Sequence, residues 1–252
     1  MYIDLEKAKQ KFLNYTNSFD TSLRPINGKI HHSLRVMELS KQIATMMNLS
    51  QEDIELATLI GLLHDLGRFE QYTQYHTFKD NNIFDHADYA YNMLNSVIRT
   101  YIDSPKYDDI IKIAIKNHNK YSIEEGLTER QLLFSKLIRD ADKLDILYEA
   151  TFYFYEDQEQ DINNSQIHPD ALDSIKNHTL IKNEVRDLSS TINSVLGVIA
   201  MAFDLNFKES FQILKENDYI NKTLDRFSIK DEENYKKIRH IVNDFIDSKL
   251  NS

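Results

Sequence analysis

The chain has 252 residues, of which 41% are hydrophobic and 28% are charged, and its formal net charge at pH 7 is −10. This composition predicts a globular protein with a sizeable core, and the acidic balance argues against general binding of nucleic acid. Cysteine is absent, which excludes disulfide bonds, thiolate metal ligands and cysteine nucleophiles.

The N-terminal residues MYIDLEKAKQKF do not contain a basic region followed by an apolar run, so no signal peptide is expected. No apolar stretch approaches the roughly 20 residues that span a bilayer. Together with the absence of cysteine, these features predict a cytoplasmic protein without a membrane partner.

Apolar residues recur at three- and four-residue spacing along most of the chain, which predicts an all-α fold. In chain order, helices are expected at residues 4–18, 28–47, 51–65, 86–98, 107–118, 129–154, 170–178, 187–203, 206–216, 218–226 and 231–249. The polar segment 155–169 is expected to be a loop. We predict one domain over 1–252, in which a C-terminal helical annex (170–250) packs on a core (26–150).

The second predicted helix contains two adjacent histidines. His32 shares a helical face with Val36, Leu39 and Ile43, whereas His31 lies on a polar face. This spacing predicts that His32 points into the core and that His31 points into solvent.

The third predicted helix is strongly apolar and ends in an imidazole and a carboxylate, His64 and Asp65. Gly67 is expected to be the C-cap of this helix, with a chain reversal that brings residues 68–80 across the site. A simple ion pair between Asp65 and Arg68 is the alternative explanation for this carboxylate.

Two later helices carry further ligand-type side chains on apolar faces. His118 ends the stripe that begins at Ile110, and Asp142 ends the stripe that begins at Phe134. An unpaired buried carboxylate is costly, and a divalent cation among histidine nitrogens and aspartate oxygens would offset that cost. Hydrogen-bonded core histidines and capping aspartates are the alternatives, and spacing alone leaves both open.

The phrases HHSLRV, LLHDLGRF and RDADKLD resemble the H…HD…D signature of the HD-domain superfamily of metal-dependent phosphohydrolases, over roughly residues 26–150. The resemblance implies a helical core that holds one divalent metal. It also implies hydrolysis of a phosphate ester, often of a nucleotide, by metal-activated water. Mn, Fe, Mg, Co, Ni and Zn all suit such ligands. The implied metal ligands are His32, His64, Asp65 and Asp142.

Two more histidines fit the extended pattern of the superfamily: His86 in DHADYAYNML and His118 in IKNHNKY. In some members the matching histidines hold a second metal or contact the phosphate. Whether this site holds one metal ion or two is therefore left open. The resemblance implies catalytic roles for four residues: Asp65 as a bridge between ions, His86 or His118 as a proton donor, and Arg68 as a phosphate ligand. A simple capping role for Asp85 is the alternative at the His86 position.

The expected partner is a small-molecule phosphate substrate. A nucleotide sensor without turnover, a di-iron oxygenase of the same superfamily and a nuclease are the alternatives. The substrate, the oligomeric state, the role of the annex and the role of Arg186 are left open by the sequence. Lys143, next to Asp142, is expected on a solvated helix face.

Overall fold

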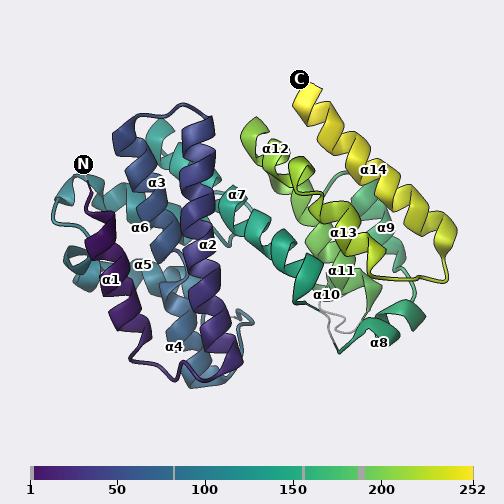
Figure 1. The fold of residues 1–252 in the computed structure, drawn as a ribbon, viewed down its shortest axis with the longest axis horizontal. Helices are drawn as coiled ribbons and strands as arrows, with labels where there is room; N and C mark the ends of the chain where they lie inside the picture. Colours follow the sequence, from purple (N-terminus) through teal and green to yellow (C-terminus); the bar gives the residue numbers. More distant parts are fainter. Residues whose placement is uncertain (1–2, 82, 155–156, 187–190, 252) are drawn as a thin grey trace. The chain divides into compact units, whose positions relative to one another are not determined.

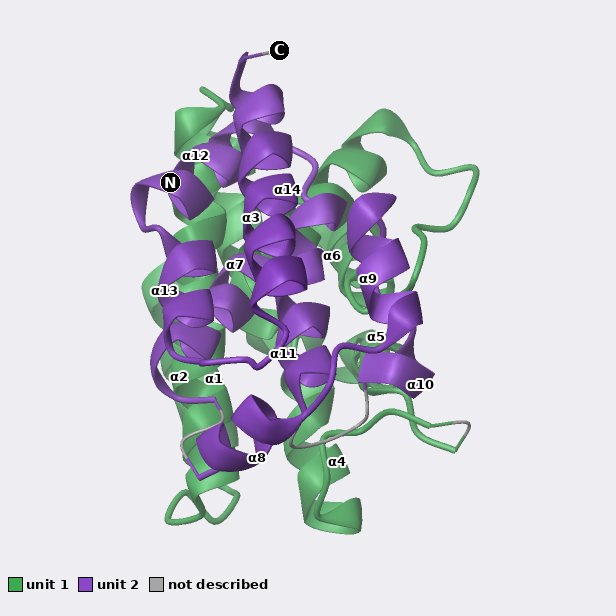
Figure 2. Cartoon of the chain, turned by 90° about the vertical axis from the view of Figure 1, so that its right-hand side faces the viewer, with its two compact units in different colours: residues 1–142 green, residues 143–252 purple. Residues whose placement is uncertain are grey.

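The computed structural model describes residues 3–81, 83–154, 157–186 and 191–251. Every regular element within these ranges is a helix (Figure 1), so the predicted all-α fold is confirmed. The chain divides into two compact units, Met1–Asp142 and Lys143–Ser252, which are coloured separately in Figure 2. The boundary falls inside helix α7 (Glu129–Phe152) and not in the polar segment 155–169. The packing of residues 170–250 on the core stays a prediction.

The first unit contains six complete helices and the beginning of α7. The six are α1 (Leu5–Thr16), α2 (Arg24–Met46), α3 (Gln51–Leu63), α4 (Leu66–Tyr75), α5 (His86–Val97) and α6 (Asp108–Asn117), with short 3-10 helices at Ile98–Thr100 and Pro105–Tyr107. Ser50 caps α3 by accepting from the backbone N–H of Asp53. Helix α3 is buried on nearly all sides, which explains its apolar composition.

Helix α4 corrects the prediction for the segment after Asp65. Gly67 is not a C-cap but lies in the first turn of this helix. A Cβ atom at Gly67 would lie 2.2 Å from the carbonyl oxygen of His86. Glycine is therefore required for the close approach of α4 to the beginning of α5. The sequence pattern alone does not show whether a glycine ends a helix or permits such a contact.

Within its described residues, the second unit contains the rest of α7 and seven further helices. They are α8 (Glu159–Asn164), α9 (Pro169–Lys176), α10 (Asn183–Arg186), α11 (Ile192–Ile199), α12 (Lys208–Glu216), α13 (Tyr219–Asp225) and α14 (Glu232–Asn251), with a 3-10 helix at Ala200–Asp204. Helix α14 contacts α9, α12 and α13, and it buries Ile238, Val242 and Ile246.

Several expectations for the second unit need correction. Helix α8 lies within the predicted loop 155–169, of which residues 155–156 are outside the described ranges. The predicted helix 187–203 is observed as α11 and the following 3-10 helix, while residues 187–190 are outside the described ranges. Lys143 is buried, and its Nζ lies 3.0 Å from Oδ2 of Asp204, so its expected solvated position was wrong.

Arg186 packs against α11 within the second unit. A Cβ atom at Gly197 would lie 2.5 Å from Cγ of Arg186, so this side chain covers the glycine.

Across the described residues, no helix combines the length and the apolar character that a membrane span requires.

Candidate metal centre

The helical-face argument for the two adjacent histidines is confirmed. His32 on α2 is 1% exposed, whereas His31 is exposed. The periodicity of the apolar stripe therefore predicts which of the two imidazoles is buried.

His64 and Asp65 occupy a corner between two helices. Helix α3 ends at Leu63 and α4 begins at Leu66. In one continuous helix, adjacent side chains would point about 100° apart. The break at Asp65 (φ −102°, ψ 19°) lets both side chains reach one point, and His64 Nε2 lies 3.5 Å from Asp65 Oδ2.

Helix α7 adds the fourth of the predicted ligands to the same point. Asp142 Oδ1 lies 3.1 Å from His32 Nε2 and 3.7 Å from His64 Nε2. The two imidazoles meet with their Nε2 atoms 3.3 Å apart, and Asp65 Oδ2 lies 3.5 Å from His32 Nε2. Residues far apart in sequence are thus brought together as the signature implies.

These separations fit a shared divalent ion. Ligand bonds of about 2.0–2.2 Å place neighbouring ligand atoms of one ion roughly 3–3.5 Å apart. The five separations given above run from 3.1 to 3.7 Å. Two groups have ligand atoms that all lie within 4.8 Å of one another: His32 with His64 and Asp142, and His64 with Asp65 and His118.

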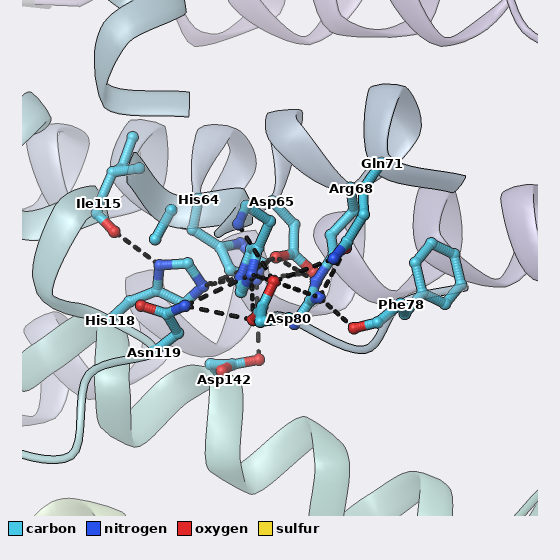
Figure 3. Close-up of polar contacts among 12 residues, drawn as sticks. His64, Asp65, Arg68, Gln71, Phe78, Asp80, Ile115, His118, Asn119 and Asp142 are labelled. Carbon is cyan, nitrogen blue, oxygen red and sulfur yellow. Dashed lines mark hydrogen bonds and ion pairs between the residues drawn. The ribbon is translucent and has the colours of Figure 1, made fainter. Parts of the chain in front are cut away.

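The protonation of two imidazoles supports the same conclusion. Nδ1 of His64 lies 2.8 Å from the carbonyl oxygen of Gly61, and Nδ1 of His118 lies 2.6 Å from that of Ile115 (Figure 3). A carbonyl oxygen only accepts, so both Nδ1 atoms carry the proton and both Nε2 atoms present lone pairs. These lone pairs face the carboxylate oxygens of Asp65, which are also acceptors. A cation between them would satisfy both.

Asp65 presents its two oxygens to two groups of histidines. Oδ2 lies near His32 and His64, whereas Oδ1 lies 3.2 Å from His86 Nε2 and 3.6 Å from His118 Nε2. The Nε2 atoms of His86 and His118 are 2.9 Å apart. We call Oδ2 of Asp65 with His32, His64 and Asp142 the first half-site. Oδ1 of Asp65 with His86 and His118 is the second half-site.

Burial and charge act against each other on the carboxylates. Burial alone would raise the pKa of Asp65, but the charge of Lys29 and the surrounding imidazoles outweigh it and hold that pKa well below its ordinary value. Burial likewise opposes ionisation of Asp142, and its contacts with His32 and His64 keep its pKa well below the ordinary value. Both groups are therefore carboxylates at neutral pH.

Burial decides the charge of His118. It lowers the pKa of this imidazole to about 4, although the negative charge of Asp65 acts in the opposite direction. At neutral pH His118 is therefore neutral, which is the protonation state of a metal ligand.

Arg68 lies beside the cluster but is engaged by its own segment. Its Nε is 3.6 Å from Asp65 Oδ1, as the ion-pair alternative supposes. Its Nη1 donates to the carbonyl oxygen of Phe78 at 2.5 Å and to Oε1 of Gln71 at 2.8 Å (Figure 3). The guanidinium thus fastens residues 78–80 to α4 as well as bordering the second half-site.

The cap at the start of α5 and the ligand-type histidine coexist. Asp85 Oδ1 accepts from the backbone N–H groups of Ala87 and Asp88, so its capping role is confirmed. His86 follows directly and is fully buried in the second half-site.

Sequence reasoning did not identify Lys29 or Asp80. Lys29 Nζ lies 2.9 Å from Asp65 Oδ2, and its side chain is 21% exposed. Lys29 precedes His32 by three residues, so the shared helical face was a usable signal. Asp80 lies between α4 and α5, and it contacts Nδ1 of His86 at 2.7 Å. No periodicity indicates where such a residue lies.

Fold and cluster together define an all-α protein with a buried His/Asp centre suited to divalent metal ions. A family model for the HD domain matches residues 30–147, which include all six histidines and aspartates of the two half-sites. The chain therefore contains an HD domain; domains of this superfamily bind divalent metals and are mostly hydrolases. Comparisons with curated proteins and with solved structures gave no match.

Proposed function

We propose that this protein is a metal-dependent phosphohydrolase that cleaves a phosphate ester or anhydride of a small molecule, with nucleotides as the preferred class. One observation carries the proposal. Within the HD domain, the Nε2 lone pairs of His64 and His118 converge on the ionised carboxylate of Asp65. Such a group of acceptors suits a divalent cation far better than a hydrogen-bonded core.

The arrangement favours two ions over one. His32, His64 and Asp142 would hold the first, His86 and His118 would hold the second, and Asp65 would contribute one oxygen to each. When bound, divalent ions lower the pKa of a coordinated water and polarise a phosphoryl oxygen.

The protein side chains supply charge and protons around that centre. Lys29 is partly exposed beside Asp65 Oδ2, where its ammonium can contact a phosphoryl oxygen of a substrate. Arg68 borders Asp65 Oδ1 and offers charge to the opposite side. His118 is neutral and buried, so it would act as a ligand and not as a general acid.

The second half-site also supports a different chemistry. An additional pair of histidines around a bridging carboxylate would equally suit two iron ions, as in the di-iron oxygenases of the superfamily. Iron content together with consumption of O₂ would identify that function. Phosphate release without O₂ consumption would identify hydrolysis.

The adjacent histidines of α2 offer a matched test. The protein loaded with Mn²⁺ is assayed on phosphate esters ranging from nucleoside monophosphates to cyclic dinucleotides. His32→Ala should abolish phosphate release from any substrate found, because it removes a ligand of the first half-site. His31→Ala should retain wild-type activity, since that imidazole is exposed. Equal losses in both variants, or no phosphate release by the wild type on the whole panel, would contradict the proposal.

A further inference from the structure

The loop residue Asp80 makes a close contact with one histidine of the second half-site. Its Oδ2 lies 2.7 Å and its Oδ1 2.9 Å from Nδ1 of His86, which is fully buried. A carboxylate only accepts, so Nδ1 of His86 carries a proton. The Nε2 atom of the same ring then points its lone pair at Asp65 Oδ1, 3.2 Å away.

The helix geometry explains why His86 needs a side-chain partner. His64 and His118 each follow the last residue of a helix, and their Nδ1 atoms donate to the carbonyl three residues earlier. His86 is instead the first residue of α5, so no preceding turn offers it a carbonyl oxygen. Asp80 accepts the hydrogen bond from Nδ1 of His86, as the carbonyl oxygens of Gly61 and Ile115 do from Nδ1 of His64 and of His118.

Asp80 is itself held in place from several directions. Its Oδ1 accepts from Gln71 Nε2 at 3.0 Å and lies 3.3 Å from Arg68 Nη1, while Oδ2 accepts from Asn119 Nδ2 at 3.3 Å. The donors His86, Gln71, Arg68 and Asn119 thus surround this side chain, which is the environment of an ionised carboxylate that only accepts. An ionised carboxylate makes its partner imidazole a stronger ligand than a carbonyl does.

The geometry points to Asp80 as the positioning residue of the second half-site: it fixes the proton of His86 on Nδ1 and so directs the Nε2 lone pair to a divalent metal. The assignment rests on the metal centre of the proposed function. Without the carboxylate, the proton would favour Nε2, where Asp65 Oδ1 and His118 Nε2 lie within 3.2 Å and can accept it. A protonated Nε2 cannot bind a metal.

Two measurements on the folded protein test this role. Long-range ¹H–¹⁵N NMR of the metal-free protein at about pH 8.5, well above the ordinary histidine pKa, reports the tautomer of His86. Wild type should show Nδ1–H, and Asp80→Ala should show Nε2–H. Calorimetric titration with Mn²⁺ should show the affinity of one site reduced by about 10–100-fold in Asp80→Ala, the range typical of lost outer-shell partners.

Variants of neighbouring residues separate positioning from general stability. Gln71→Ala removes a buried donor to the same carboxylate but leaves the Asp80–His86 contact, so it should keep the tautomer and the Mn²⁺ affinity. Asp80→Asn retains an acceptor for Nδ1 without the charge. It should therefore keep the tautomer, lower the affinity less than Asp80→Ala does, and serve in its place if that variant fails to fold.

The outcomes that overturn the two proposals differ. Wild-type protein that binds no Mn²⁺ would refute the metal-dependent function itself. If the wild type binds Mn²⁺, two results would refute only the role of Asp80. One is an unchanged Mn²⁺ affinity in Asp80→Ala, and the other is an equally large loss of affinity in Gln71→Ala. Nε2–H in metal-free wild type would also refute that role.

Discussion

His118 should make the stability of the metal-free protein depend on pH. The residue is 3% exposed, and burial lowers its pKa to about 4, against about 6.5 for an ordinary histidine. The unfolded chain therefore binds this proton more readily than the folded chain. The resulting stability is fully present above about pH 6.5 and is lost as the pH falls towards 4. For these two pKa values, acidification from pH 7 to 4.5 lowers the free energy of unfolding by about 2.5 kcal/mol.

Urea unfolding of chelator-treated protein measures this loss. His118→Asn is the matched variant, because its amide can still donate to the carbonyl of Ile115 but cannot titrate. Between pH 7 and 4.5 the wild type should lose about 2.5 kcal/mol more than the variant does. The same pH dependence in both proteins would show that His118 is not the neutral, buried imidazole described above.

Three further predictions concern the corner between α3 and α4. Asp65→Ala should lose both ions and Asp142→Ala only one, because Asp65 alone faces both half-sites; metal analysis after dialysis against Mn²⁺ measures this. Lys29→Met should tighten Mn²⁺ binding about tenfold in calorimetry while slowing turnover, since the ammonium beside Asp65 repels a bound cation. Gly67→Ala should lower the free energy of unfolding by about 1–3 kcal/mol in urea, because the added Cβ would overlap the carbonyl oxygen of His86.

Each of these predictions has a definite contradiction. Retention of an ion by Asp65→Ala would exclude the bridging role. Weaker Mn²⁺ binding by Lys29→Met would show that the ammonium supports the ligands rather than competing with the metal. For the glycine, Gly28→Ala is the control, because no atom lies within 4 Å of a Cβ there. If both alanine variants unfold alike, the close contact of α4 with α5 is not needed.

Residues on long helices could be placed from the sequence, because periodicity determines which face is buried. This applies to His32 and His31, and the buried position of His118 and the contact of Asp142 with His32 follow in the same way. The resemblance then grouped residues that periodicity alone cannot bring together. Both kinds of reasoning depend on regular spacing or on a known phrase.

Other features lack such a signal. Helix α4 is short and follows α3 after a two-residue break, so the sequence pattern predicts a helix end at Gly67, whereas the structure has a close contact there. Asp80 lies on no periodic face, and its partners come from α4, from α5 and from the segment after α6. The predicted helix 86–98 already places His86 at a helix start, but only the tertiary structure shows that Asp80 accepts from its Nδ1.

The position of Asp142 in α7 has a practical consequence for fragment design. Asp142 is the last residue of the first unit, yet α7 continues to Phe152. A fragment cut at that boundary would end at Asp142, so its new C-terminal carboxylate would lie beside the side chain that is proposed to bind the metal. Its last four carbonyl groups would also lack amide partners, so the turn containing Arg139 and Asp142 would fray. A fragment for crystallisation or NMR should therefore continue for at least one further helical turn, to about residue 147.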